Sequence, residues 1–425
     1  MKDKKLKFDY SWVIIGIAFL MVLTSLGFCS SGRAIYLNAI TDALKIPRGV
    51  FSISHSIRYI ATTVINIYFG KLVAKFGTKK LICAGFLCLM CFALMNAVAT
   101  KVITFYIASI FLGAGLSWTG TSMVSCIINR WCKKNKGTIT GATLAANGLG
   151  GALAIQIISP IIYAPGKPFG YRTSYILVSF ILLAMLALVM IFYREFPKDS
   201  EEKDTQVSGK KRKARGEGWI GMDYKDVVKK PYFYMTLLCI FLTGFTLQGL
   251  NGIAFPHMYD IGIDVKFVTL LTSLSSIMLM VSKFATGFSY DKLGIRITMN
   301  TCLVCAFVSV FGLIFLTNTQ SGYVLAFIRS ILSSFALPLE TVMLPLYASE
   351  LFGNKSFDKT VGVFVSANYA GFAIGSPMGN ILYDFFGSYN IAFLIFSIMM
   401  IIVAVLMQFV LSQANKDKKT ILAQN

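Results

Sequence analysis

Twelve apolar stretches, each long enough to cross a bilayer, dominate this chain of 425 residues. A helix of about 20 apolar residues spans the hydrocarbon core of a membrane. We place the stretches at about 12–37, 50–70, 81–99, 103–127, 138–163, 173–193, 232–257, 266–289, 298–317, 322–348, 360–383 and 389–412. Only 14% of the residues are charged, whereas soluble globular proteins contain about 25%. The pattern predicts an all-α membrane protein with twelve transmembrane helices.

A polar segment divides the predicted helices into two sets of six. This segment, 194–230, is rich in Lys and Arg and has no apolar periodicity. It separates an N-terminal six-helix bundle at 1–193 from a C-terminal six-helix bundle at 231–425. We therefore interpret it as a linker between two membrane domains.

The two predicted bundles are related in sequence. Gly70 and Gly77 recur as Gly287 and Gly294, 217 residues later. The same offset relates Phe-Gly pairs near the starts of the sixth and twelfth spans. Parallel repeats of six helices around a linker are one of the ways in which transporters are built. We expect two pseudo-symmetric six-helix bundles.

The basic residues orient the chain in the membrane. With both termini inside, 30 Lys and Arg residues fall in predicted cytoplasmic segments and six fall in predicted outer loops. Such a bias marks the cytoplasmic side of a membrane protein. The net charge of +21 is thereby explained by topology and by attraction to lipid, so we expect the lipid bilayer as a partner and no nucleic acid. The chain is predicted to lie in the plasma membrane with both termini and the linker in the cytoplasm.

Two loops share a glycine-rich motif. The segment 70–80 and its repeat 287–296 resemble the loop motif of major facilitator transporters, in which a carboxylate and cations latch the cytoplasmic side. Ala74 stands where the first copy of the motif has an acid, whereas Asp291 keeps the acid in the second copy. The resemblance implies a cytoplasmic gate formed by Gly70, Gly77, Gly287, Asp291, Gly294 and Arg296.

A second resemblance narrows the group. Residues 130–151 run from an aromatic and basic cluster into a glycine- and alanine-rich apolar stretch. Small residues allow membrane helices to pack closely. The segment is similar to the fifth-helix signature of the oxalate–formate antiporter and monocarboxylate transporter group.

Lys283 lies inside the eighth predicted span, four residues before Gly287. A charged side chain within a bilayer is costly and by default marks a functional site. In the resembled group, this position is basic and engages the substrate carboxylate. The alternative for Lys283 is a structural ion pair within the bundle.

Arg58 lies near the middle of the second span and shares a helix face with Thr62 and Asn66. Asn66 is the repeat counterpart of Lys283. The polar face predicts one wall of a central site. The alternative for Arg58 is that it reaches the outer headgroups; for Arg33 and Arg329, this alternative stands beside a gating or substrate role.

Asn147 and Asn368 occupy matching positions in the fifth and eleventh spans. The resemblance implies substrate binding by residues at these positions, although the oxalate–formate pattern has a second cation where Asn368 stands. Glu340, in the tenth span, either pairs with Lys283 or carries a proton. Proton-coupled monocarboxylate transporters have an acid at the position of Leu279, so their coupling route is not implied here.

We expect a secondary transporter that moves a small organic anion, preferably a monocarboxylate, by alternating access. Lys283, Arg58, Asn66, Asn147 and Asn368 are its predicted substrate-binding residues. A transporter of another solute, such as a drug-like compound, is the alternative, and a membrane receptor or sensor is a further one. Two His residues and scattered Cys residues give no metal-ligand or nucleophile pattern, so we expect no metal, no cofactor and no enzymatic activity. We also expect a monomer.

Overall fold

The computed structural model describes residues 10–31, 36–163, 169–196 and 221–423, and every regular element within these ranges is a helix. In the first half, the helices are α1 Ser11–Val22, the π-helix η1 Leu23–Ser30, α2 Tyr36–Leu44, α3 Arg48–Ile67, α4 Phe69–Phe76, α5 Thr78–Val98, α6 Val102–Thr119, α7 Thr121–Trp131, α8 Lys136–Ile162 and α9 Gly170–Phe192. Arg33 and residues 197–220 of the predicted linker lie outside the described residues.

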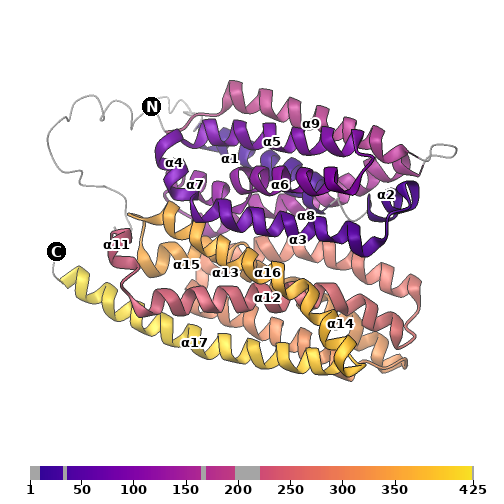
Figure 1. Cartoon of the computed structure of the whole chain (residues 1–425). Coiled ribbons are helices and arrows are strands. Elements are labelled where there is room, and N and C mark those ends of the chain that lie inside the picture. Colours follow the sequence, from indigo (N-terminus) through magenta and orange to yellow (C-terminus); the bar gives the residue numbers. More distant parts are fainter. Residues whose placement is uncertain (1–9, 32–35, 164–168, 197–220, 424–425) are drawn as a thin grey trace, which may run out of the picture.

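The second half begins beyond the linker. Its helices are α11 Tyr224–Val227, α12 Pro231–Asp260, α13 Val265–Phe311, the 3₁₀ helix η3 Gly312–Phe315, α14 Gln320–Ala336, the 3₁₀ helix η4 Leu337–Glu340, α15 Met343–Phe352, α16 Phe357–Phe386 and α17 Asn390–Ala423. The two halves lie side by side with their long helices roughly parallel (Figure 1). We call the end at which α9 ends and α12 begins the linker end, and the opposite end the far end.

Nine helical stretches of the described residues are long and apolar enough to cross a membrane. One of them, Lys266–Phe315, contains both the eighth and the ninth predicted spans, because α13 runs through a turn at Gly294, which has φ 79°. The second and eleventh predicted spans, α3 and α16, are not among the nine. These two helices carry polar residues and pack against each other between the halves. The predicted fold class, two six-helix membrane bundles, is confirmed.

Several span boundaries were predicted wrongly. The first span was drawn to Leu37, but η1 ends at Ser30 and the separate helix α2 begins at Tyr36. The fourth span breaks at Gly120 between α6 and α7, and the tenth breaks at η4, where Pro338 cannot donate a helical hydrogen bond. Hydropathy does not report such breaks, because the residues on both sides are apolar.

Glycine permits the close approach of the two halves. The α8–α13 seam places Gly137 against Gly287 and Gly141 against the backbone carbonyl of Lys283, where a Cβ atom would clash. In the α3–α16 seam, Gly362 lies against the carbonyl of Asn66. The predicted tight packing of the 130–151 segment is confirmed, since contacts this short between helix backbones require small residues.

Candidate functional site

The linker end is closed by a helix cap that joins the two halves. The Asp291 carboxylate accepts hydrogen bonds from the backbone N–H of Gly137 (3.1 Å), from the backbone N–H of Thr138 (2.7 Å) and from the Thr138 hydroxyl (2.7 Å). The first N–H groups of a helix have no partner within that helix and favour an anion. Asp291 thus caps α8 from the other half. The close approach of Gly287 to Gly137 brings the Asp291 side chain to the first turn of α8.

In the α3–α16 seam, Ala74 occupies the motif position that matches Asp291. That position therefore has no carboxylate. The first turn of α16 has no side-chain cap, but it carries Asp358, which pairs with Arg130 at 3.2 Å. Arg130 also lies 3.5 Å from Glu195. The carboxylate that joins this seam therefore lies on the helix itself and reaches a cation on the opposite half.

The remaining motif residues shape the loops. Gly77 and Gly294 both have φ 79°, a conformation that side-chain-bearing residues rarely adopt. Gly70 lies against the backbone of Lys359 on α16. Arg296 is exposed and, within the described part of the chain, has no hydrogen-bond or ion-pair partner, so its predicted gate role stays a prediction.

Between the two ends, and nearer the turn at Gly294 than the start of α13, Lys283 is buried, with 2% of its surface exposed. Its Nζ donates to the carbonyl of Leu144 on α8 at 3.4 Å, and it interacts electrostatically with Glu340. Glu340 is also buried, and its Oε1 has no hydrogen-bond partner. The amide of Asn368 donates to the backbone carbonyl of Glu340 at 3.2 Å, which leaves the Asn368 Oδ1 atom without a partner.

Arg58 contributes a cation from the first half. It is 6% exposed, donates from Nη1 to the hydroxyl of Ser30 at 2.8 Å and has no partner at Nε. The alternative that Arg58 reaches the headgroups is therefore wrong. The Arg58 guanidinium group lies over the Tyr59 ring, 4.3 Å from its centroid, and Tyr59 packs against Tyr369 of α16.

The predicted Asn residues differ in how many hydrogen bonds their side chains make within the protein. The Asn66 amide donates to the carbonyl of Thr62 and to the hydroxyl of Ser117, both at 2.9 Å, and its oxygen accepts from Ser122 at 2.7 Å. These bonds lie within the first half and use both N–H donors of the amide group. Asn147 accepts a hydrogen bond from Ser31 at 2.8 Å.

Sequence reasoning missed an aromatic contact between the halves. The rings of Tyr59 and Phe372 meet edge to face with centroids 5.5 Å apart, and Tyr59 and Tyr369 are 6.0 Å apart. Gln248 donates to the Tyr59 hydroxyl at 3.1 Å. The only sequence signal was their position beside Arg58 and Asn368, because aromatic residues are common along the whole chain.

Arg329 is a further buried cation, 4% exposed. This burial does not agree with the alternative in which Arg329 reaches the outer headgroups. It lies on α14, toward the far end from Ser334, whose carbonyl accepts from Ser282 beside Lys283. Arg329 thus lies at a different depth from Lys283.

Each half buries a cation, Arg58 in the first half and Lys283 in the second. Glu340 is a buried carboxyl group of the second half. Buried charge is costly unless it is paired. Buried cations with donors that lack a partner are candidate ligands of an anion. Among the described residues, no group of three His, Cys, Asp or Glu side chains has the geometry of a metal site.

Comparison with known proteins gives consistent matches. The family model of the Major Facilitator Superfamily matches residues 17–345 and 237–425. The chain is 23% identical over 410 residues to the oxalate:formate antiporter of Oxalobacter formigenes, covering 96% of this chain and 93% of that protein. It is 20% identical to the sialic acid transporter of Escherichia coli, covering 63% of this chain and 62% of that protein. The fold is similar to that of the E. coli fucose:proton symporter, with a TM-score of 0.71 at 14% identity, over 95% of this chain and 99% of that one.

Proposed function

This chain belongs to the Major Facilitator Superfamily of transporters, and we propose from that premise that it carries a small organic monoanion across the plasma membrane by alternating access. A monocarboxylate is the substrate that the site favours. The observation that carries the proposal is that each half buries a cation inside a membrane-spanning helix, Arg58 on α3 and Lys283 on α13.

A carboxylate fits the groups that remain free. Lys283 has one described hydrogen bond and that bond is long, 3.4 Å to Leu144, while Arg58 has an unpaired Nε–H. Charge-assisted hydrogen bonds from such donors to a carboxylate are stronger than neutral ones. The carboxyl group of the substrate lies between Arg58 and Lys283 in this proposal, and Asn147 and Asn368 contact the rest of the molecule. Asn66 supports the wall of the site through its bonds within the first half.

Glu340 takes the place of the substrate when the site is empty. Its electrostatic attraction compensates part of the cost of burying the Lys283 ammonium group, and the incoming carboxylate takes over that role. The free Glu340 Oε1 leaves this side chain able to turn away. A relative whose name states that it exchanges oxalate for formate is similar over nearly the whole chain, which supports a carboxylate as cargo.

The linker end forms the gate. The cap at Asp291 and the ion pair of Arg130 with Asp358 close it in the present structure. Both contacts must break when the two halves rock and expose the site at that end. The positive-inside bias supports a linker end that faces the cytoplasm. We propose that the protein acts as a monomer.

Counterflow in proteoliposomes tests the proposal. Labelled monocarboxylates, dicarboxylates and the neutral amides of the same acids are compared for exchange by the full-length protein. Lys283→Gln removes the charge, so its affinity for a monocarboxylate should fall about tenfold to a hundredfold, because a hydrogen bond to a charged group contributes about 1.5–3 kcal/mol. Asn147→Ala, which changes no charge, serves as the matched control and should weaken binding less. Exchange of the amide at the rate of the acid, or unchanged affinity in Lys283→Gln, would refute the anion assignment.

A further inference from the structure

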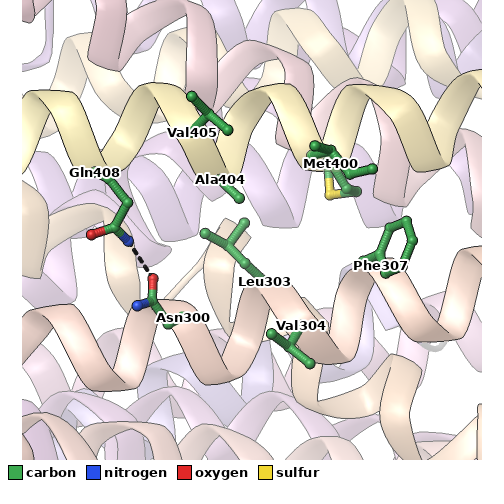
Figure 2. A pocket seen from close by; sticks show the side chains of 9 residues that line it. Asn300, Leu303, Val304, Phe307, Met400, Ala404, Val405 and Gln408 are labelled. Carbon is green, nitrogen blue, oxygen red and sulfur yellow. Dashed lines mark hydrogen bonds between the residues drawn. The ribbon is translucent and has the colours of Figure 1, made fainter.

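The membrane-facing surface of the second half has a groove between α17 and the part of α13 that follows Gly294. Its volume is about 400 Å³. Leu303 and Met400 form a buried floor, while Val304 and Val405 form exposed rims. Figure 2 shows these side chains projecting from the two helices that border the groove. Such a groove fits an extended apolar chain.

The groove is polar at one end only. There, Gln408 donates to the side-chain oxygen of Asn300 at 2.5 Å (Figure 2). Asn300 follows Gly294 by six residues, about 9 Å along a helix, so the amide pair lies toward the linker end. Arg296 lies one turn beyond Asn300 on the same face of α13. The α13 wall thus runs from Val304, which is apolar, through an amide to a cation.

The α17 wall repeats this order. Its membrane-facing residues continue at spacings of three and four from the groove toward the linker end: Val405, Gln408, Ser412, Asn415 and Lys419. Residues at this spacing share one helix face. Both walls therefore change from apolar to amide to cation toward the linker end, over about 6 Å from Asn300 to Arg296 and about 17 Å from Gln408 to Lys419. This is the order of acyl chain, ester and phosphate in a phospholipid.

Arg296 is free because of how α17 continues. Its repeat counterpart, Lys79, donates to the carbonyl of Met190 at 2.9 Å. Met190 lies in the last turn of α9, where carbonyls have no partner within the helix. In contrast, α17 continues to Ala423 and uses its carbonyls at this depth internally. In the part of the chain that the structure describes, Arg296 consequently has no hydrogen-bond or ion-pair partner.

We propose that this groove binds an anionic phospholipid of the linker-end leaflet. One acyl chain lies over Leu303 and Met400, the ester region meets the Asn300–Gln408 pair, and the phosphate meets Arg296. A second copy of the chain fits the surface less well. A two-fold contact centred on the cationic end of the groove would bring Arg296 and Lys419 against the same cations of the other copy.

Native mass spectrometry of the purified full-length protein tests the site. The protein in detergent is titrated with phosphatidylglycerol and, separately, with phosphatidylcholine of the same acyl chains. We expect tighter binding of phosphatidylglycerol. Arg296→Gln should weaken its binding about fivefold, as expected for one cation near an anionic lipid surface, and should leave phosphatidylcholine unchanged. Lys292→Gln removes an exposed charge from the same end, where the side chain lies over the Phe288 ring, and should have no such effect.

Filling the groove gives the second measurement. Val405→Trp adds bulk at an exposed rim and should lower the binding of both lipids. Equal binding of the two lipids to the parent protein, or equal losses in Arg296→Gln and Lys292→Gln, would overturn the proposal. A dimer that Val405→Trp dissociates would also overturn it, since a second copy would then be the occupant.

Discussion

Replacing Asp291 with Asn should shift the protein toward a state that is open at the linker end. In the closed state, one Asp291 oxygen accepts from Gly137 and the other accepts both the N–H and the hydroxyl of Thr138. The Asn side chain has one acceptor oxygen and an NH₂ group that can only donate. At least one backbone N–H of α8 must therefore lose its partner, and the charge at the helix N-terminus is lost as well.

The size of the shift follows from these contacts. Removing the side-chain cap of a helix costs about 0.5–2 kcal/mol. The cap exists only when the two halves meet at the linker end, so its loss acts on the closed state and leaves the open state unchanged. A change of about 1–2 kcal/mol alters the ratio of closed to open molecules about fivefold to thirtyfold.

Pulsed electron paramagnetic resonance measures this ratio. Spin labels at Lys133 and Lys292, which are exposed on opposite halves, report the width of the linker end in a Cys-free protein in nanodiscs. Asp291→Asn should increase the population with the longer distance. Asp223→Asn is the matched control, because Asp223 lies at the same end but pairs with Lys355 of its own half. A distance distribution that is the same in Asp291→Asn and the parent would refute the capping argument.

Two further changes test the other seam. In a double-mutant cycle with Arg130→Gln and Asp358→Asn, the same labels should give a coupling energy of about 0.2–1 kcal/mol, because the side chains are partly exposed; a value of zero would show that the pair does not hold the seam. Ala74→Asp should supply a cap for α16, which has none from a side chain, and should raise the closed population; a raised open population would instead show that repulsion from Asp358 dominates.

The fold could be predicted because its signals are repeated along the chain. Long apolar runs, one polar linker and a recurring offset of 217 residues all indicated two bundles. The helix breaks at Gly120 and at Pro338 could not be placed, since the apolar pattern continues through them. The helices α3 and α16 were predicted as spans from their length and apolar content, although they do not meet the hydropathy criterion that nine other stretches meet.

The sequence predicted the charged residues of the candidate site but not its contacts between distant residues. A lone cation in an apolar run is conspicuous, so Lys283 and Arg58 were found, and their burial agrees with a place inside the protein. Their roles in substrate binding stay predictions. The contact of Tyr59 with Tyr369 joins residues more than 300 positions apart, and one sequence does not reveal such pairs. The pair of Arg130 with Asp358 was missed for the same reason, because it joins residues 228 positions apart.

The π-helix η1 makes the two halves unlike at the site. A π-helix closes its hydrogen bonds over five residues instead of four, so the side chains after Leu23 turn out of phase with a regular helix. Ser30, at the end of η1, reaches Arg58. Its repeat counterpart, Leu247, lies in α12, which is α-helical throughout and buries that residue. The pseudo-two-fold symmetry is therefore broken around Arg58. If the proposed site is correct, the two ends of a bound molecule meet chemically different surfaces, and such a carrier distinguishes the head of its cargo from the tail.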